Sequence, residues 1–196
     1  MTRFITFFVT ALLLASASLS HAIESLAFDV LETNKGIEVR RYAPHMLATV
    51  RVAADFKEAG SEAFRPLFDF ISGDNASAEK IAMTAPVLQQ PGGEAGQWLI
   101  SFVMPSDFDR ESLPAPSSNV VNVSEQPAML MAALQYRGGW SQSRYRQHEA
   151  KLMNAISELS LEACGEPRWA RHDPPFMPWF MRKNEILIPL CDAVPL

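Results

Sequence analysis

Hydrophobic and polar residues alternate along several short segments of the chain, a pattern that predicts β-strands. In the first half of the chain these segments are 37–42, 46–52, 80–89 and 98–104. In the second half they are 120–124, 129–136, 168–171 and 186–190. Between the second and third strand of each half, apolar residues recur at three- and four-residue steps, which predicts an amphipathic helix.

Capping residues give the expected limits of both helices. Asp55 is suited to begin the first helix and Gly73 follows its end, while Pro66 inside it is expected to kink or restart the helix. Ser141 or Ser143 is expected to begin the second helix, which would run to about residue 163.

The order strand, strand, helix, strand, strand therefore occurs twice. The segments 44–47 (Pro-His-Met-Leu) and 127–130 (Pro-Ala-Met-Leu) occupy the same place in the two units, 83 residues apart. In each unit the first two strands are expected to pair as a hairpin. We infer an internal duplication of fold class α+β, a distorted antiparallel β-barrel of about eight strands with two packed helices. One half alone would expose a helix face and sheet edges, so residues 23–196 are expected to form a single domain.

The two cysteines test this topology. They are too few for a disulfide framework and resemble no zinc module. If 168–171 pairs antiparallel with 186–190, opposite positions sum to about 356, and Cys164 and Cys191 sum to 355. They are therefore expected to lie close together, either bridged in an oxidising compartment or as two buried thiols.

Residues 1–22 have the pattern of a secretory signal peptide, with Arg3, an apolar run over 4–14 and small residues leading to Ala22. The mature chain would start at Ile23 and be periplasmic or secreted. The apolar run is shorter than the about 20 residues that a spanning helix needs, and later apolar runs are broken by charge or proline. No stable membrane insertion is expected after cleavage, and an uncleaved anchor is the alternative.

Composition narrows the function classes. The chain of 196 residues is 48% apolar and has 17 Lys and Arg against 22 Asp and Glu, with no basic run, so a nucleic-acid partner is not expected. No motif for a nucleophilic serine, a phosphate-binding loop, a dinucleotide or a catalytic zinc is present, and no catalytic residue is predicted. The proline-broken segment from Phe176 to Met181 is unusually apolar. It would bind an apolar ligand or a protein partner, or fold back onto the barrel end.

Four motifs resemble the SOUL haem-binding family. They are Lys-Ile-Ala-Met-Thr-Ala-Pro-Val at 80–87, Phe-Val-Met-Pro-Ser at 102–106, Ala-Arg-His-Asp-Pro-Pro at 170–175 and Arg-Lys-Asn-Glu-Ile at 182–186. The resemblance covers about 23–190. It implies a duplicated, distorted β-barrel with two helices, similar to effector-binding domains of some bacterial regulators. It also implies binding of haem or another tetrapyrrole in an apolar cleft. Catalysis is not implied as a common property of the family.

The resemblance carries over unevenly to single residues. Some members have a histidine before the tyrosine of the first strand, proposed as axial ligand, and here that position is Arg41. Arginine cannot ligate iron but suits a haem propionate. His172 stands where the family commonly has tyrosine and is the candidate axial ligand. The alternative is that it forms hydrogen bonds within the turn at 171–175. Met83 lies in the most specific of the four motifs. Its alternation with Ile81, Ala85 and Val87 along the expected strand also fits an ordinary core face.

These observations predict an exported protein that binds haem or a related tetrapyrrole, for transport, buffering or scavenging. The macrocycle would lie against Phe64, Leu67 and Phe68 of the first helix, with Arg41 or another cation near the propionates and with or without a strong axial bond. One alternative is a hydrolase or tetrapyrrole-modifying enzyme in the same cleft, using His172 or a carboxylate such as Glu185. The other is a partner-binding module that uses segment 176–181.

Overall fold

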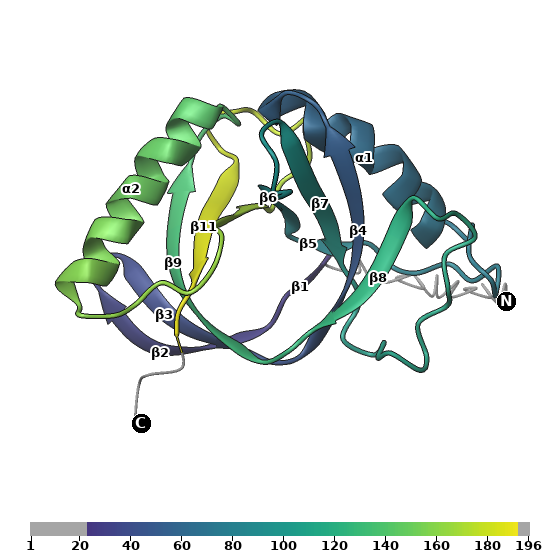
Figure 1. The fold of residues 1–196 in the computed structure, drawn as a ribbon, viewed down its shortest axis with the longest axis horizontal. Coiled ribbons are helices and arrows are strands. Elements are labelled where there is room, and N and C mark those ends of the chain that lie inside the picture. Colours follow the sequence, from purple (N-terminus) through teal and green to yellow (C-terminus); the bar gives the residue numbers. More distant parts are fainter. Residues whose placement is uncertain (1–22, 192–196) are drawn as a thin grey trace, which may run out of the picture.

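The computed structural model describes residues 23–191, so the expected signal peptide lies outside the described residues. This part of the chain forms a strongly curled sheet with two helices on its outer side (Figure 1). The elements follow in this order: β1 (Glu24–Ser25), β2 (Phe28–Asn34), β3 (Ile37–Tyr42), β4 (His45–Ala53), α1 (Phe56–Ile71), β5 (Thr84–Ala85), β6 (Val87–Pro91), β7 (Gln97–Val103), β8 (Val121–Gln126), β9 (Met129–Arg137), α2 (Gln142–Glu158), β10 (Arg168–Arg171) and β11 (Lys183–Pro189).

The order of strands in the large sheet confirms the predicted fold class. Nine strands are antiparallel neighbours in the order β2-β3-β9-β11-β10-β6-β7-β4-β8. Leaving out β2, each strand of one half has its counterpart at the mirrored place in this order: β3 with β8, β9 with β4, β11 with β7 and β10 with β6. The two halves are thus related by an approximate two-fold axis between β10 and β6, as a duplication requires.

The two predicted hairpins are wrong, because the halves exchange their first strands. β3 pairs with β9, and β8 pairs with β4. The connections between β3 and β4 and between β8 and β9 are only two residues long, and each contains a proline, Pro44 or Pro127. A two-residue hairpin of type I′ needs positive φ at both residues, and one of type II′ needs it at the first. Ala43-Pro44 and Pro127-Ala128 both disfavour these angles, and the chain crosses to the other half instead.

The helices cover the outer face of the sheet. α1 packs on β4 and β7, and α2 packs on β9 and β11. Pro66 lies within α1 without dividing it into two helices. Ser141 caps α2 by accepting a hydrogen bond from the Arg144 amide. α2 ends earlier than expected, at Glu158, where Ser160 adopts a left-handed φ of 55° and closes the helix with the hydrogen bonds of a Schellman motif.

Side chains alternate between the two faces of the sheet and build two separate cores. The outer core lies under the helices and is rich in aromatic side chains, including Phe56, Trp98, Tyr145 and Trp169. The inner core lines the concave side and is smaller; its larger members are Tyr42, Leu47, Leu88, Val103, Met131 and Leu187. A residue's place on the outer or inner face therefore decides which groups it can meet.

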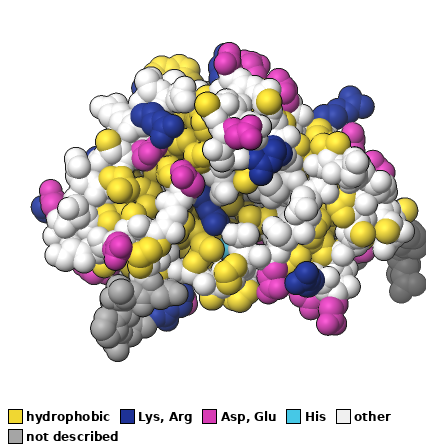
Figure 2. Space-filling model, viewed as in Figure 1, with side chains coloured by type: hydrophobic (Ala, Val, Ile, Leu, Met, Phe, Trp, Pro, Cys, Tyr) yellow, Lys and Arg dark blue, Asp and Glu magenta, His cyan; other side chains and the backbone are white. Residues whose placement is uncertain are grey.

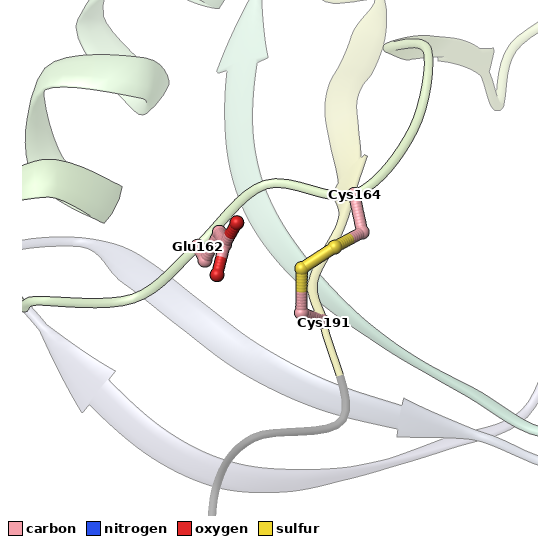
Figure 3. Close-up of side chains that lie close together, drawn as sticks. All are labelled: Glu162, Cys164 and Cys191. Atoms are coloured by element: carbon pink, nitrogen blue, oxygen red, sulfur yellow. A yellow bond between two sulfur atoms is a disulfide. The ribbon is translucent and has the colours of Figure 1, made fainter.

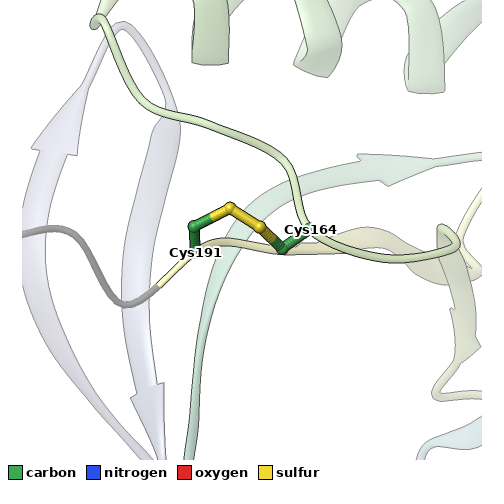
Figure 4. Close-up of a disulfide and its surroundings, with 2 residues drawn as sticks. All are labelled: Cys164 and Cys191. Atoms are coloured by element: carbon green, nitrogen blue, oxygen red, sulfur yellow. A yellow bond between two sulfur atoms is a disulfide. The ribbon is translucent and has the colours of Figure 1, made fainter.

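A disulfide joins Cys164 to Cys191, with the Cα atoms 5.1 Å apart (Figure 4). β10 and β11 pair as expected, one position from the expected register, with Arg168 opposite Leu187. The bridge ties the segment after α2 to the end of β11. Of the two states left open by the sequence, the structure has the bridged one.

Some details of the sheet differ from the prediction. The expected strand 80–89 is divided at Pro86, which lacks the N–H that a ladder needs, so β5 pairs with β1 while β6 pairs with β7 and β10. β2 is an exposed edge strand that no alternating pattern indicated. Neither helix of residues 23–191 is long and apolar enough to cross a bilayer. On the face shown in Figure 2, charged side chains of both signs are scattered among hydrophobic ones.

Candidate functional site

The outward side of α1 carries a pair of exposed aromatic rings, which we call the α1 patch: Phe64 and Phe68. They are one helical turn apart and expose 43% and 45% of their surface. The rings stack with their centroids 5.7 Å apart, and Phe64 also meets the buried ring of Phe102 of β7 edge to face. The contact with Phe102 therefore fixes the pair on the sheet side, while the other side of the two rings stays open to solvent.

Met83 lies near the strand that supports this patch. The hydroxyl of Thr84 donates a hydrogen bond to the carbonyl of Val103, the residue after Phe102. Met83 comes immediately before Thr84, outside the strand in which it was expected, and its side chain is exposed. It is thus available to a ligand and is not part of the core.

Leu67 has a different role from its two aromatic neighbours. It is fully buried in the outer core, facing the sheet. Of the three residues expected to form one apolar face of the first helix, Phe64 and Phe68 are accessible, whereas Leu67 anchors the helix.

Two exposed cations lie on α1 or beside its end. Arg65 directly follows Phe64 and makes a solvent-exposed ion pair with Asp69, with Nε and Oδ2 3.5 Å apart. Lys80 is exposed and lies just beyond the end of α1, next to Ile81, whose amide donates to the last residue of the helix. Exposed ion pairs are weak, so either cation is free to meet an anionic group of a ligand.

Arg41 is not brought to α1. It lies in β3, and four strands of the sheet separate β3 from β7, on which α1 packs. Ile37, which shares its face of β3, lines a cavity with residues of α2. The structure therefore places Arg41 in the half of the molecule that α2 covers.

His172 belongs to a buried ionic cluster on the inner face of the sheet. Its Nε2 is 2.8 Å from Oε2 of Glu185, and the guanidinium of Arg40 is 3.1 Å from Oε1 of the same carboxylate. Arg40 also donates to the Tyr42 hydroxyl at 3.1 Å, and the Lys183 ammonium lies 3.7 Å from Glu185. Both Glu185 and Arg40 are almost wholly buried.

The cluster keeps Glu185 ionised. Burial alone would raise the pKa of this carboxyl, but the hydrogen bonds and charges of His172 and Arg40 lower it to about 2. A carboxylate can only accept hydrogen bonds, so Nε2 of His172 carries the proton and donates it. The only ring nitrogen left for iron is Nδ1.

The cluster and the α1 patch lie on opposite faces of the sheet. Arg171, the residue before His172, reaches the outer face, where its guanidinium lies against Gly60 of α1. His172 and Glu185, which the sequence marked as candidate acid and base, do meet, but a carboxylate with so low a pKa is a weak base near neutral pH. Arg40 was missed, although its alternation with Arg41 places it on the inner face with Tyr42.

Cavities lie elsewhere on the molecule. One of about 770 Å³ lies between β8 and segment 110–116, and one of about 590 Å³ lies between α2 and the β2–β3 turn. A third, of about 200 Å³, lies between β1 and segment 103–108 and reaches Thr84. Neither ring of the α1 patch lines any of these three, and both rings are half-exposed, so the patch offers a flat ligand an accessible surface.

The disulfide region also contains the carboxylate of Glu162 (Figure 3). One ligand atom from each of Glu162, Cys164 and Cys191 lies within 4.8 Å of the others. Both sulfurs are bonded to each other, and metal ions bind thiolates, so this group does not form a metal site in the bridged protein.

The geometry first defines a class: a duplicated α+β half-barrel with two outer helices, whose halves exchange their first strands. The sequence pattern of the SOUL heme-binding protein family matches residues 23–189. The chain belongs to this family, as its four motifs indicated.

Other proteins of known name or known structure are similar to this chain. The chain is 26% identical over 180 residues to Heme-binding protein 1 of Mus musculus, covering 86% of this chain and 94% of that protein. It is 23% identical over 188 residues to Heme-binding protein 1 of Xenopus tropicalis, covering 84% and 95%. The C-terminal domain of EcmrR has the same fold, with a TM-score of 0.63 at 13% identity over 79% of this chain and 96% of that domain.

Proposed function

We propose that the protein binds haem or a related tetrapyrrole on the α1 patch. The observation that carries the proposal is the stacked, half-exposed pair Phe64 and Phe68 in a chain of the SOUL heme-binding family. The names of the mouse and frog relatives support the same ligand.

Burial of apolar surface would supply most of the affinity. A flat macrocycle laid on the two rings removes apolar area from water on both partners, at roughly 25 cal/mol per Å². Arg65 and Lys80 would pair with the propionates and fix the orientation, the role expected of Arg41. The exposed Met83, beside the end of β7, would offer a further apolar contact.

The site would hold the ligand without His172 as an axial ligand. Its Nε2 is bonded to Glu185, and its ring lies on the face of the sheet opposite α1. When bound, haem would supply an iron centre, and the residues of the α1 patch would supply shape and apolar contact. A role in transport, buffering or scavenging follows from such a site.

We further propose that the chain is exported and cleaved after Ala22, to act in a periplasm or outside the cell. The bridge between Cys164 and Cys191 supports this, because disulfides persist in oxidising compartments. Mass spectrometry of the protein purified from its native host tests it. A mature chain beginning at Ile23 is expected, and an intact N-terminus would contradict the proposal.

Titration with haemin, followed in the Soret band, tests the ligand site. Phe64→Ser with Phe68→Ser is expected to weaken binding by about tenfold or more, since each ring contributes 1 to 2 kcal/mol or so of burial. The matched control is Phe176→Ser with Phe180→Ser, which removes two exposed rings elsewhere and is expected to leave haemin affinity unchanged. Equal affinity of all three proteins would refute the α1 patch as the site.

A further inference from the structure

The loop between β10 and β11 gathers four exposed large apolar side chains, including the two most exposed ones of residues 23–191, Phe176 and Trp179. Phe176, Trp179, Phe180 and Met181 expose between 48% and 85% of their surface. Trp179 and Phe180 also contact one another edge to face, with centroids 5.8 Å apart. The sequence left open whether this segment folds back onto the barrel, and these side chains project into solvent instead.

Hydrogen bonds from two arginine side chains and within two turns fix the backbone of this loop. The Arg182 guanidinium donates from Nε to the Met177 carbonyl at 2.8 Å and also bonds the Pro175 carbonyl. Arg137 donates to the Met181 carbonyl at 2.6 Å. The amides of Met177 and Met181 close two tight turns, on Pro174 and Pro178. The loop therefore satisfies much of its backbone internally while it points its apolar side chains outward.

Positive charge surrounds the base of the loop. Arg137 and Arg182 bond neutral carbonyl groups, and no carboxylate of residues 23–191 forms an ion pair with either. Arg182 also packs on the Trp140 ring, with the guanidinium carbon 4.3 Å from the centroid. Arg144 lies against Gly138, next to Arg137, and is exposed. The nearest acid in the chain, Asp173, accepts a hydrogen bond from the Lys183 amide.

We propose that this loop is a membrane-docking element that inserts its apolar side chains into the interface of an anionic phospholipid bilayer. Aromatic side chains, tryptophan above all, favour the depth of the lipid headgroups. The two closed turns and the arginine-bonded carbonyls reduce the number of backbone polar groups that the loop would carry unpaired into an apolar medium. Cations behind the apolar tip lie where lipid phosphates would be, and they are attracted to an anionic surface. The proposal goes beyond haem binding and does not rest on it.

A second protein chain fits this surface less well. A stable protein interface buries about 800 Å² on each partner, whereas four partly exposed side chains offer roughly 500 Å². A second chain would also need a surface of complementary shape to pack closely on these side chains. A bilayer needs no complementary shape, which favours lipid as the occupant.

Vesicle binding of the haem-free protein tests the proposal. Sedimentation with vesicles of phosphatidylcholine and phosphatidylglycerol at 7:3 is expected to show binding that weakens at high salt and with phosphatidylcholine alone. Phe176→Ser with Phe180→Ser is expected to weaken it by about tenfold or more. Because both side chains are exposed, this variant is expected to fold as the parent does, which near-UV circular dichroism verifies.

A second measurement locates the contact. Lipids brominated near the headgroup are expected to quench Trp179. Trp98 and Trp169 are buried, and Trp140 is partly buried at the base of the loop, so Trp179→Phe in a Trp140→Phe background is expected to remove most of the quenching. The matched control is Phe64→Ser with Phe68→Ser, which is expected to bind vesicles as the parent does. Absence of vesicle binding, loss of binding only in the α1 control, or loop-dependent dimers without vesicle binding would each overturn the proposal.

Discussion

Nε2 of His172 donates to Oε2 of Glu185 at 2.8 Å and thereby links the end of β10 to β11 on the inner face of the sheet. Arg40 completes the cluster from β3, two strands away from β11. The three side chains join segments that are far apart in the sequence. Since a buried ion is costly without its partners, the cluster is expected to govern stability and not chemistry.

Acid sensitivity should reflect Glu185. Its pKa in the folded protein is about 2, below the ordinary value of 4.5, so its contribution is complete above pH 4.5 and is lost as the pH falls towards 2. The expected loss over this window is on the order of 3 kcal/mol. Urea unfolding at several pH values measures it. Glu185→Gln should be less stable at pH 7 and have a flatter profile between pH 4.5 and 2; parallel profiles would contradict the assignment.

Replacing His172 separates iron ligation from structural support. His172→Ala is expected to leave the Soret band at the same wavelength and to change haemin affinity by less than about twofold, because the ring lies on the face opposite the α1 patch. It should lower the free energy of unfolding by about 1.5 to 3 kcal/mol, the value of a hydrogen bond to a charged group. A shifted Soret band in this variant would show that His172 ligates the iron after all.

Leu67 and Phe64 should respond in opposite ways. Leu67→Ala leaves a cavity in the outer core and is expected to cost about 2 to 5 kcal/mol of stability, while haemin affinity is kept in the fraction that is folded. Phe64→Ser should reduce haemin affinity with a smaller effect on the melting temperature. Calorimetry combined with haemin titration of both variants makes the comparison. If Leu67→Ala lost affinity as Phe64→Ser does, this would contradict the assignment of haemin binding to the exposed side of α1.

Gly60 marks the contact between α1 and β10. A Cβ at this position would overlap Nη1 of Arg171, whose guanidinium also bonds Gln89. In a free helix Gly→Ala is stabilising by up to about 1 kcal/mol, but overpacking costs about 1 to 3 kcal/mol. Gly60→Ala is therefore expected to lower the melting temperature. Gly139→Ala, whose Cβ would meet nothing within 4 Å, is the control and should be near neutral; a higher melting temperature for Gly60→Ala would show that Arg171 moves freely.

The sequence predicted the positions of the helices and strands better than it predicted which strands pair. Alternation located β3 and β10 to the residue, and three- and four-residue spacing located α1. The exchange of β3 and β8 was missed because hairpin formation was inferred from closeness along the chain. The prolines at 44 and 127 were the available signal, since both disfavour a two-residue hairpin turn.

The site was predicted in part for a similar reason. Helical spacing placed Phe64, Leu67 and Phe68 on one broad stripe, but only the packing against β7 shows which of them face the sheet. Arg41 was selected by its motif position, whereas its distance from α1 follows from the order of nine strands, which local pattern cannot give. The inner-face cluster depends on Arg40 meeting Glu185, 145 residues away in the chain.

The exchanged strands set the time at which the molecule can fold. β3 finds its second neighbour only when β9 exists, so residues 37–42 wait for a partner that ends at residue 137. Pairing of such distant segments is slow, and neither half is a complete folding unit. β10 and β11 lie between β9 and β6 and end only at residue 189, so a ribosome must deliver almost the whole chain before the sheet can close.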